Sequence, residues 1–169
     1  MSEIDEFQGW FAGRIPDGWF TGAPEVTADR EEILVVGTLP EAEVGKDATD
    51  AVRAGARQAR IDGFRQDTRE RRMRLAAEAE HRFQRKVSWG AVCGDVRRLF
   101  TIQSLPVMTR LRMPERAVLD TLVNAGVARS RSDALGWCVR LVGENQSAWI
   151  DRLREALTTV ERARAEGPG

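Results

Sequence analysis

The side chains with the clearest chemical potential in this 169-residue chain lie in the segment 107–113, which follows Pro106 and reads VMTRLRM. Its alternation of apolar and polar residues is typical of a β-strand. A period of two divides the segment into two faces, one with Val107, Thr109, Leu111 and Met113 and the other with Met108, Arg110 and Arg112. The first face can be buried. The second presents two guanidinium groups, whose chemistry is ion pairing and hydrogen bonding with an anionic or polar partner.

Residues typical of catalytic or metal centres are sparse and scattered. There is no nucleophile motif, no glycine-rich phosphate loop and no cluster with metal-ligand spacing. His81 is the only histidine, and Cys93 and Cys138 lack Cys-x-x-Cys spacing. The glutamate pairs 31–32 and 78–80 are interpreted as solvated surface. We therefore expect no enzyme activity, no metal and no cofactor.

Local signals define the elements around segment 107–113. Pro114 favours the start of a helix, and Gly126 favours its end. Ser130-Arg131-Ser132-Asp133 reads as a capping box, in which the Ser130 hydroxyl accepts from the backbone N–H of Asp133 and the carboxylate reaches back. A second helix follows to about Gly143, with Gly136 weakening its middle. An amphipathic helix is predicted over about 147–165.

The ordered sequence of basic strand, proline-started helix, glycine turn and serine-capped helix resembles the ribbon-helix-helix family of Arc- and MetJ-type DNA-binding proteins. The segment MTRLRMPERAVLDTLVNAGVARSRSDAL carries the resemblance, which covers residues 105–143. It implies that two chains pair their strands into one antiparallel ribbon that enters the major groove. Residues 107–113 would then be the dimer contact, since two short helices bury little surface alone.

The resemblance also implies a role for each polar side chain of the unit. The residues expected to contact bases are Met108, Arg110 and Arg112. Those expected to contact phosphates, together with the backbone N–H groups that begin the second helix, are Arg129, Ser130, Arg131 and Ser132. In many members of the family the unit begins a small chain, whereas here about 100 residues precede it.

The preceding residues read as β-elements and one long basic helix. Gly9-Trp10-Phe11-Ala12-Gly13 recurs as Gly18-Trp19-Phe20-Thr21-Gly22, which predicts two short aromatic strands joined by a turn. A hairpin is predicted from 25–27 and 33–37, a linker over 39–49, an Arg-rich helix from about 49 to 86 and a second hairpin over 87–101 with its turn near 93–95. The aromatic side chains are mostly expected to form the core of a small unit.

Charge is distributed unevenly along a chain whose formal net charge is zero. Residues 1–50 contain 12 acidic and three basic residues, whereas residues 51–140 contain 19 basic and nine acidic ones. The basic middle suits a polyanionic partner, and the acidic front could fold onto it or repel nonspecific nucleic acid. Alternatively, the two are ordinary solvated surfaces of opposite sign.

Together these patterns predict a helix-rich α+β protein with an acidic Trp-containing β-module and linker (1–46), an Arg-rich helix (47–86), a connector (87–104), a ribbon-helix-helix unit (105–145), a C-terminal helix (146–165) and a tail (166–169). The expected function is that of a homodimeric, cytoplasmic, sequence-specific DNA-binding protein, a transcriptional regulator whose partners are double-stranded DNA, a second copy and possible protein partners of residues 1–46. Two alternatives remain open. One is an antitoxin-like or assembly protein that uses the fold for dimerisation; the other is a nucleoid or partition protein with weak sequence preference. No run of 18 apolar residues exists, so no membrane partner is expected.

Overall fold

The computed structural model describes residues 3–101 and 103–167. It contains both helices and a sheet, which confirms the helix-rich α+β class. The chain divides into two units, Met1–Pro106 and Val107–Gly169. This division lies next to the expected boundary at residue 105, whereas segments 1–46, 47–86 and 87–104 share one sheet and one core. Each unit is described by itself below.

The first unit is built on a four-stranded sheet with the order β1-β2-β3-β4. Strands β1 (Glu25–Ala28) and β2 (Glu32–Thr38) form an antiparallel hairpin, as do β3 (Lys86–Cys93) and β4 (Val96–Leu99). The two hairpins were predicted from the sequence and are confirmed. The parallel pairing of β2 with β3, in which Val35 lies opposite Trp89, joins them into one sheet. Parallel neighbours need a long crossover, and helices α2 (Asp50–Asp67) and α3 (Arg69–Phe83) provide it.

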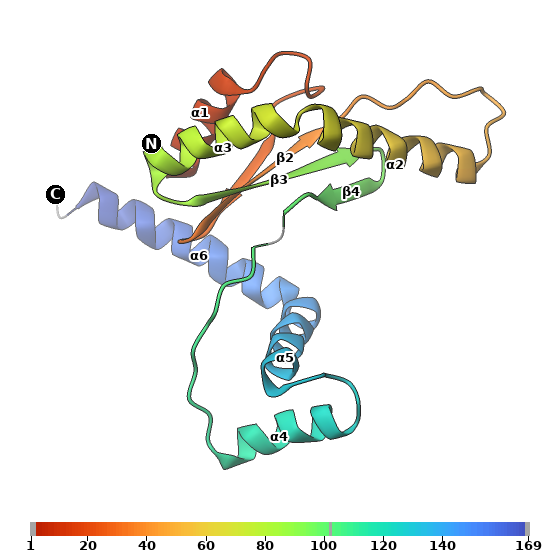
Figure 1. The fold of residues 1–169 in the computed structure, drawn as a ribbon. Helices are drawn as coiled ribbons and strands as arrows, with labels where there is room; N and C mark the ends of the chain where they lie inside the picture. Colours follow the sequence, from red (N-terminus) through yellow and green to blue (C-terminus); the bar gives the residue numbers. More distant parts are fainter. Residues whose placement is uncertain (1–2, 102, 168–169) are drawn as a thin grey trace. The chain divides into compact units, whose positions relative to one another are not determined.

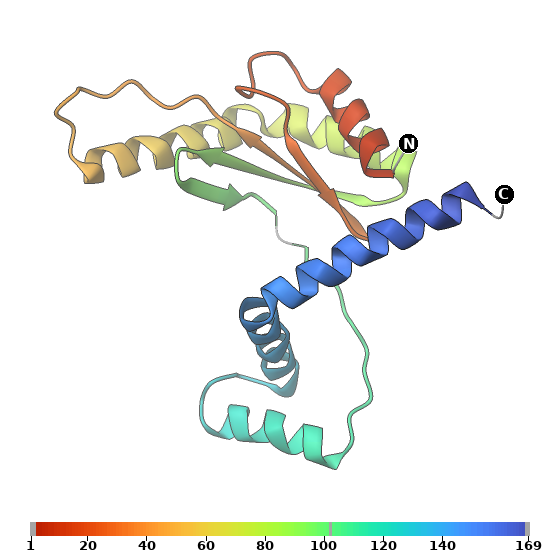
Figure 2. The same ribbon diagram turned by 180° about the vertical axis from the view of Figure 1, so that it is seen from behind.

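The three helices of this unit lie on the same face of the sheet (Figures 1 and 2). They are α1 (Glu3–Arg14), α2 (Asp50–Asp67) and α3 (Arg69–Phe83). Phe7 and Phe11 of α1 and Leu75 of α3 pack with Val35 and Trp89 in the main core. The aromatic residues at the front of the chain therefore serve largely as core, as expected.

The predicted pair of aromatic strands at 9–22 is wrong. The first copy of the repeat lies inside α1, and the second lies in the turn and bend residues 17–22. Acidic residues in the first turn of α1 favour a helix, and the four-residue spacing of Phe7 and Phe11 places both on one helical face. The short motif recurs, but the residues that flank its two copies differ, so the two copies adopt different structures.

The predicted helix over 49–86 is interrupted at Thr68. The Thr68 hydroxyl donates to the Phe64 carbonyl at 2.5 Å, and the Arg72 guanidinium donates through Nη2 to the Arg65 carbonyl at 2.6 Å. Side chains therefore take carbonyl groups at the break, a recognised cause of helix kinks. The predicted linker at 39–49 contains no helix or strand.

The second unit is helical. Its helices are α4 (Met113–Asn124), α5 (Arg131–Asn145) and α6 (Ser147–Glu166). Gly126 follows α4 with φ +75°, the left-handed conformation that suits a glycine after a helix end. Leu119, Ala128 and Ala134 form the small buried cluster between α4 and α5. Of the predicted tail, Glu166 belongs to α6, and residues 168–169 lie outside the described residues.

Candidate nucleic-acid interface

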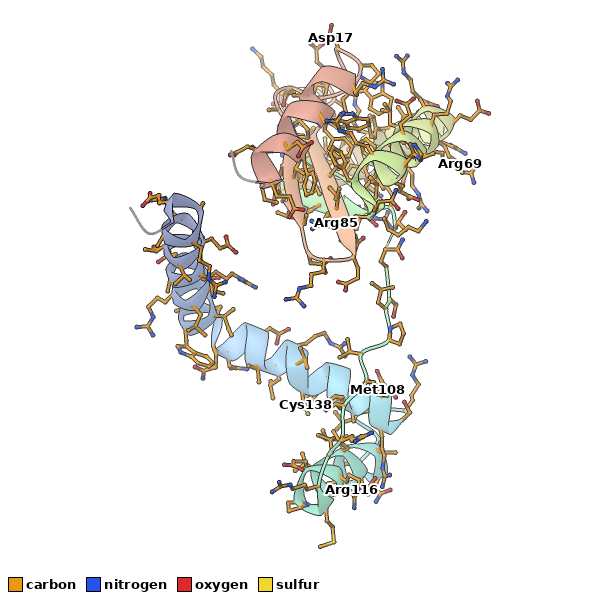
Figure 3. The ribbon with its side chains drawn as sticks, turned by 90° about the vertical axis from the view of Figure 1, so that its left-hand side faces the viewer. Asp17, Arg69, Arg85, Met108, Arg116 and Cys138 are labelled. Carbon is orange, nitrogen blue, oxygen red and sulfur yellow. The ribbon has the colours of Figure 1, made fainter. Side chains whose placement is uncertain are left out.

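Residues 103–112 lead into α4 as a segment that is neither helix nor strand (Figure 3). Val107 and Met108 are 86% and 96% exposed. The predicted strand 107–113 is therefore not formed within the single chain, and Met113 is the first residue of α4 rather than the last of a strand. A strand exists through hydrogen bonds to a neighbour, and no strand within the described residues pairs with this segment.

The apolar face that its alternation predicts is covered in part: Leu111 is half-buried, whereas Val107, Thr109 and Met113 are exposed. Leu111 packs against the buried cluster of the second unit, and Arg112 has extended backbone dihedrals. Because neighbouring side chains of extended backbone point to opposite sides, the alternation predicts that Arg110 and Arg112 lie on the side away from that cluster. Both are exposed, and neither guanidinium has an ion-pair partner within the described part of the chain. Met108, on the same side by this alternation, is almost fully exposed.

The start of α4 fixes the backbone beside these arginines. The Glu115 carboxylate accepts a hydrogen bond from the Arg112 backbone N–H, and Arg116 donates through Nη1 to the Leu111 carbonyl at 2.7 Å. Pro114 lies in the first turn, as expected. The main chain of Arg112 is thus held in place while its guanidinium remains available.

The start of α5 has the predicted cap. Ser130 Oγ accepts from the Asp133 backbone N–H at 3.2 Å, and Asp133 Oδ2 accepts from the Arg129 backbone N–H at 3.0 Å. The carboxylate therefore reaches back one residue beyond Ser130. The Arg129 side chain is 96% exposed, and Ser132 is exposed as well. All four residues expected to contact phosphates are exposed at one helix end.

Arg131, the fourth residue of that set, has an internal partner. Its Nε and Nη2 each lie 2.7 Å from a carboxylate oxygen of Asp120 on α4. This paired hydrogen bond lowers the pKa of Asp120 and raises that of Arg131. The interaction ties the start of α5 to α4, so Arg131 has a structural role that the sequence pattern did not indicate.

A large apolar surface of the second unit lies uncovered in the single chain. Its members are 41–86% exposed: Val107, Met113, Val118, Val127, Val139, Leu141, Val142, Trp149, Leu153, Leu157 and Val160. On α6 the spacing of three and four residues places Ile150, Leu153 and Leu157 on one stripe. Exposed apolar side chains in such number are typical of an interaction surface.

Two features of the first unit were not expected from the sequence. One is a cavity of about 570 Å³ between α2 and the loops around Trp19 and Leu39. The small residues Ala56, Ala59 and Gly63 of α2 leave room for the cavity on one side of the helix. Their helical spacing is the sequence signal from which the cavity could have been predicted. The other is the buried Arg72, which is 6% exposed.

Other candidate chemistry in the first unit is limited. His81 is exposed, and burial raises the pKa of the Cys93 thiol, which disfavours the reactive thiolate. Within residues 3–101 and 103–167, no group of three histidine, cysteine or acidic residues could hold a metal ion. No helix in the same ranges is sufficiently long and apolar to span a membrane.

These features define a two-unit α+β protein whose second unit lacks a strand partner and leaves apolar surface uncovered. Residues 5–99 match the family described as Rv1265-like protein, N-terminal domain, and residues 112–164 match the Mb1296 C-terminal domain. The chain is 55% identical over 159 residues to the uncharacterized proteins Mb1296 of Mycobacterium bovis and Rv1265 of Mycobacterium tuberculosis; each alignment covers 94% of this chain and 69% of the relative. The chain belongs to the Rv1265-like family. No solved structure matches it.

Proposed function

We propose that this protein is a homodimeric, sequence-specific DNA-binding protein that acts as a transcriptional regulator. In the dimer, residues 107–112 of two chains pair as an antiparallel ribbon of ribbon-helix-helix type. Arg110 and Arg112, with Met108 beside them, enter the major groove and contact bases. The start of α5, with Arg129, Ser130 and Ser132, contacts phosphates; Arg131 contributes mainly by holding Asp120.

The observation that carries this proposal is the unpaired extended segment before α4. Its Leu111 side chain packs inward while Arg110 and Arg112 are exposed without ion-pair partners in the described residues. The backbone groups of residues 107–110 form no hydrogen bond within the described residues, and pairing with an identical copy would stabilise such a segment. Pairing two such segments gathers four guanidinium groups on one face, which suits the major groove.

Substitution of the two arginines tests base readout. We expect Arg110→Ala and Arg112→Ala each to cost about 1–3 kcal/mol in binding to a selected duplex and to relax sequence preference. Arg140→Ala is the matched control, because Arg140 is an exposed arginine of α5 outside the set proposed to contact DNA. The measurement is a binding isotherm on the selected and on a random duplex at one salt concentration. If folded, dimeric arginine variants bind the selected duplex as the control does, the ribbon does not read bases.

The same isotherms separate the two alternatives. A nucleoid or partition protein would bind both duplexes with similar affinity and a strong salt dependence. An antitoxin-like or assembly protein that uses the unit for dimerisation would remain dimeric and bind neither duplex. A preference for the selected duplex that depends on Arg110 and Arg112 favours the regulator.

Small-molecule binding in the first unit is a second candidate function, and the cavity of about 570 Å³ favours it. Trp19 and Phe64 line it with aromatic surface and Arg60 adds a cation, a combination that suits a planar aromatic acid. Naphthoate serves as a probe in a thermal-shift experiment on the parent, Gly63→Leu and Gly55→Leu proteins. Both glycines lie in α2 with open space beyond the Cβ position, but Gly63 alone of the two lines the cavity. We expect the probe to raise the melting temperature of the parent and of Gly55→Leu but not of Gly63→Leu; equal shifts in all three place binding elsewhere.

A further inference from the structure

Carboxylates within the first unit occupy many of its arginines. Acidic residues of the three helices, of β1 and of the loops pair with arginines that lie far away in the sequence. The pairs are Arg14–Glu78, Arg57–Glu41, Arg57–Asp95, Arg82–Glu6, Arg85–Glu3, Arg97–Glu25 and Arg98–Asp62. These arginines already have counter-ions, so the positive charge of the sequence is not all available to a polyanion.

The junction of α2 and α3 is different. Arg65 and Arg72 lie over the same aromatic ring, with their Cζ atoms 5.9 Å and 4.7 Å from the centre of Phe100. Arg69 lies between them in sequence, and steps of four and three residues place all three on one side of the helical path. Figure 3 shows Arg69 at the outer edge of this unit. None of the three forms an ion pair with a carboxylate in the described residues, although Asp67 and Glu70 are close in sequence.

Arg72 is the fixed member of this cluster. It is 6% exposed, and its Nε donates to Thr68 Oγ1 at 2.9 Å while Nη2 donates to the Arg65 carbonyl. Burial, followed by repulsion from Arg65 and Arg69, lowers the pKa of Arg72 to about 10, so it remains charged at neutral pH. A buried cation without a carboxylate partner is stabilised by an external anion.

We propose that Arg65, Arg69 and Arg72 form a phosphate-binding site at the α2–α3 junction, and that its ligand is a backbone phosphate of duplex DNA. Guanidinium groups match phosphate oxygens with paired N–H donors, and stacking on Phe100 fixes two of them before binding. The contact involves no base and is therefore independent of sequence. The DNA assignment rests on the proposed function; the phosphate site itself does not.

The test uses the full-length double variant Arg65→Gln/Arg69→Gln. Arg72 is left intact because its hydrogen bonds support the kink. The matched control is Arg71→Gln/Arg74→Gln, which removes the same charge from exposed arginines that helical spacing places on other sides of α3. Melting curves establish that both proteins fold. Two readouts follow: affinity for a random duplex as a function of salt, and the increase in melting temperature when phosphate replaces chloride at constant ionic strength.

We expect the Arg65/Arg69 variant to bind random DNA roughly tenfold more weakly. The slope of log affinity against log salt concentration should be smaller in magnitude by about 1–2, because each lost phosphate contact reduces counterion release. It should also lose the stabilisation by phosphate, and the control should retain it. If the stabilisation by phosphate depends on Arg65 and Arg69 but DNA binding does not, the ligand is a free phosphate compound. The DNA assignment is then overturned. If both variants behave alike in both readouts, no phosphate site exists. Failure of the proposed function would instead appear as Arg110→Ala and Arg112→Ala proteins that bind the selected duplex as the Arg140→Ala control does.

Discussion

Arg110 and Arg131 lie in the same unit and were both expected to contact DNA, but their surroundings differ. Arg110 is exposed on an unpaired segment, whereas Arg131 makes a paired hydrogen bond to Asp120. A guanidinium with a counter-ion gains less from a phosphate, because the existing ion pair must be exchanged. The sequence shows that both arginines lie in a predicted strand or near a helix start. The structure distinguishes them by the positions of the neighbouring carboxylates.

Ser130→Ala separates backbone positioning from base readout. Loss of the hydroxyl that accepts from the Asp133 N–H should lower the free energy of unfolding by about 1 kcal/mol. On the proposed function, it should also weaken binding to selected and random duplexes by the same factor. Thermal melting and isotherms measure the two effects. Ser132→Ala is the control for stability alone, because Ser132 follows the cap position but belongs to the set proposed to contact phosphates. A Ser130→Ala protein as stable as Ser132→Ala would contradict the role of the cap.

The Asp120–Arg131 pair should make stability depend on acidity. Because Arg131 lowers the folded-state pKa of Asp120 below its ordinary value of 3.8, the contribution is present above that value and is lost as the pH falls through the lower, folded-state pKa. Asp120→Asn should therefore be less stable than the parent near neutral pH, and the difference should shrink in acid. Chemical denaturation at several pH values checks this expectation. A difference that stays constant down to strongly acidic pH would show that the charge of Asp120 does not matter.

At the scale of elements, α1 joins the acidic front to the basic helices. Glu6 pairs with Arg82 at 3.1 Å and Glu3 with Arg85 at 2.7 Å, so the front folds onto the basic middle, one of the two arrangements expected from charge. Phe7 and Phe11 anchor the same helix in the core. Because α1 is both an acidic surface and part of the core, substitution of its charges is a cleaner test than its removal.

The variant Glu3→Gln/Glu6→Gln tests whether α1 limits nonspecific DNA binding. Arg82 and Arg85 would lose their carboxylate partners, so affinity for a random duplex should rise. The slope of log affinity against log salt concentration should steepen by the equivalent of up to about two phosphate contacts. The control is Glu43→Gln, an exposed loop residue that forms no ion pair in the described residues. Isotherms over a range of salt concentration provide the measurement. Equal behaviour of the two variants would show that these ion pairs serve only the fold.

At the scale of the whole molecule, the uncovered apolar residues of the second unit require an explanation. Val107, Met113 and the stripe of α6 are exposed in the single chain, whereas the first unit buries its aromatic core. Surface of this kind is costly to leave in water, and in the proposed homodimer a second copy would cover it symmetrically. The proposed ribbon and the apolar surface therefore call for the same partner.

Light scattering should give about twice the mass of one chain at low micromolar concentration. Val107→Asp should reduce this mass toward one chain, because pairing two segments would bring the introduced charges together on the face meant to be buried. Val52→Asp is the control, since Val52 is an exposed apolar residue of α2 in the first unit. A folded parent protein that scatters as a single chain would contradict the ribbon, as would a Val107→Asp protein that stays dimeric.

The sequence by itself determined the elements whose signals are local. Pro114, Gly126 and Ser130 mark the ends of α4 and α5 because capping and turn chemistry depend on a few neighbouring residues. The alternation at 107–113 likewise predicted a covered and an exposed face, and in the structure Leu111 is half-buried whereas Arg110 and Arg112 are exposed. The residues proposed to contact DNA were identified by the resemblance of residues 105–143 to the ribbon-helix-helix family, and their role stays a prediction.

The tertiary structure decided the features that join distant residues. Parallel pairing of β2 with β3, the break at Thr68, the Asp120–Arg131 pair and the unpaired cluster around Phe100 each depend on which side chains meet after folding. The sequence repeat at 9–22 was misleading for the same reason, because packing of Phe7 and Phe11 outweighed a local resemblance to strands. Local chemistry sets the ends of elements, whereas the counter-ion of each arginine is set by the fold.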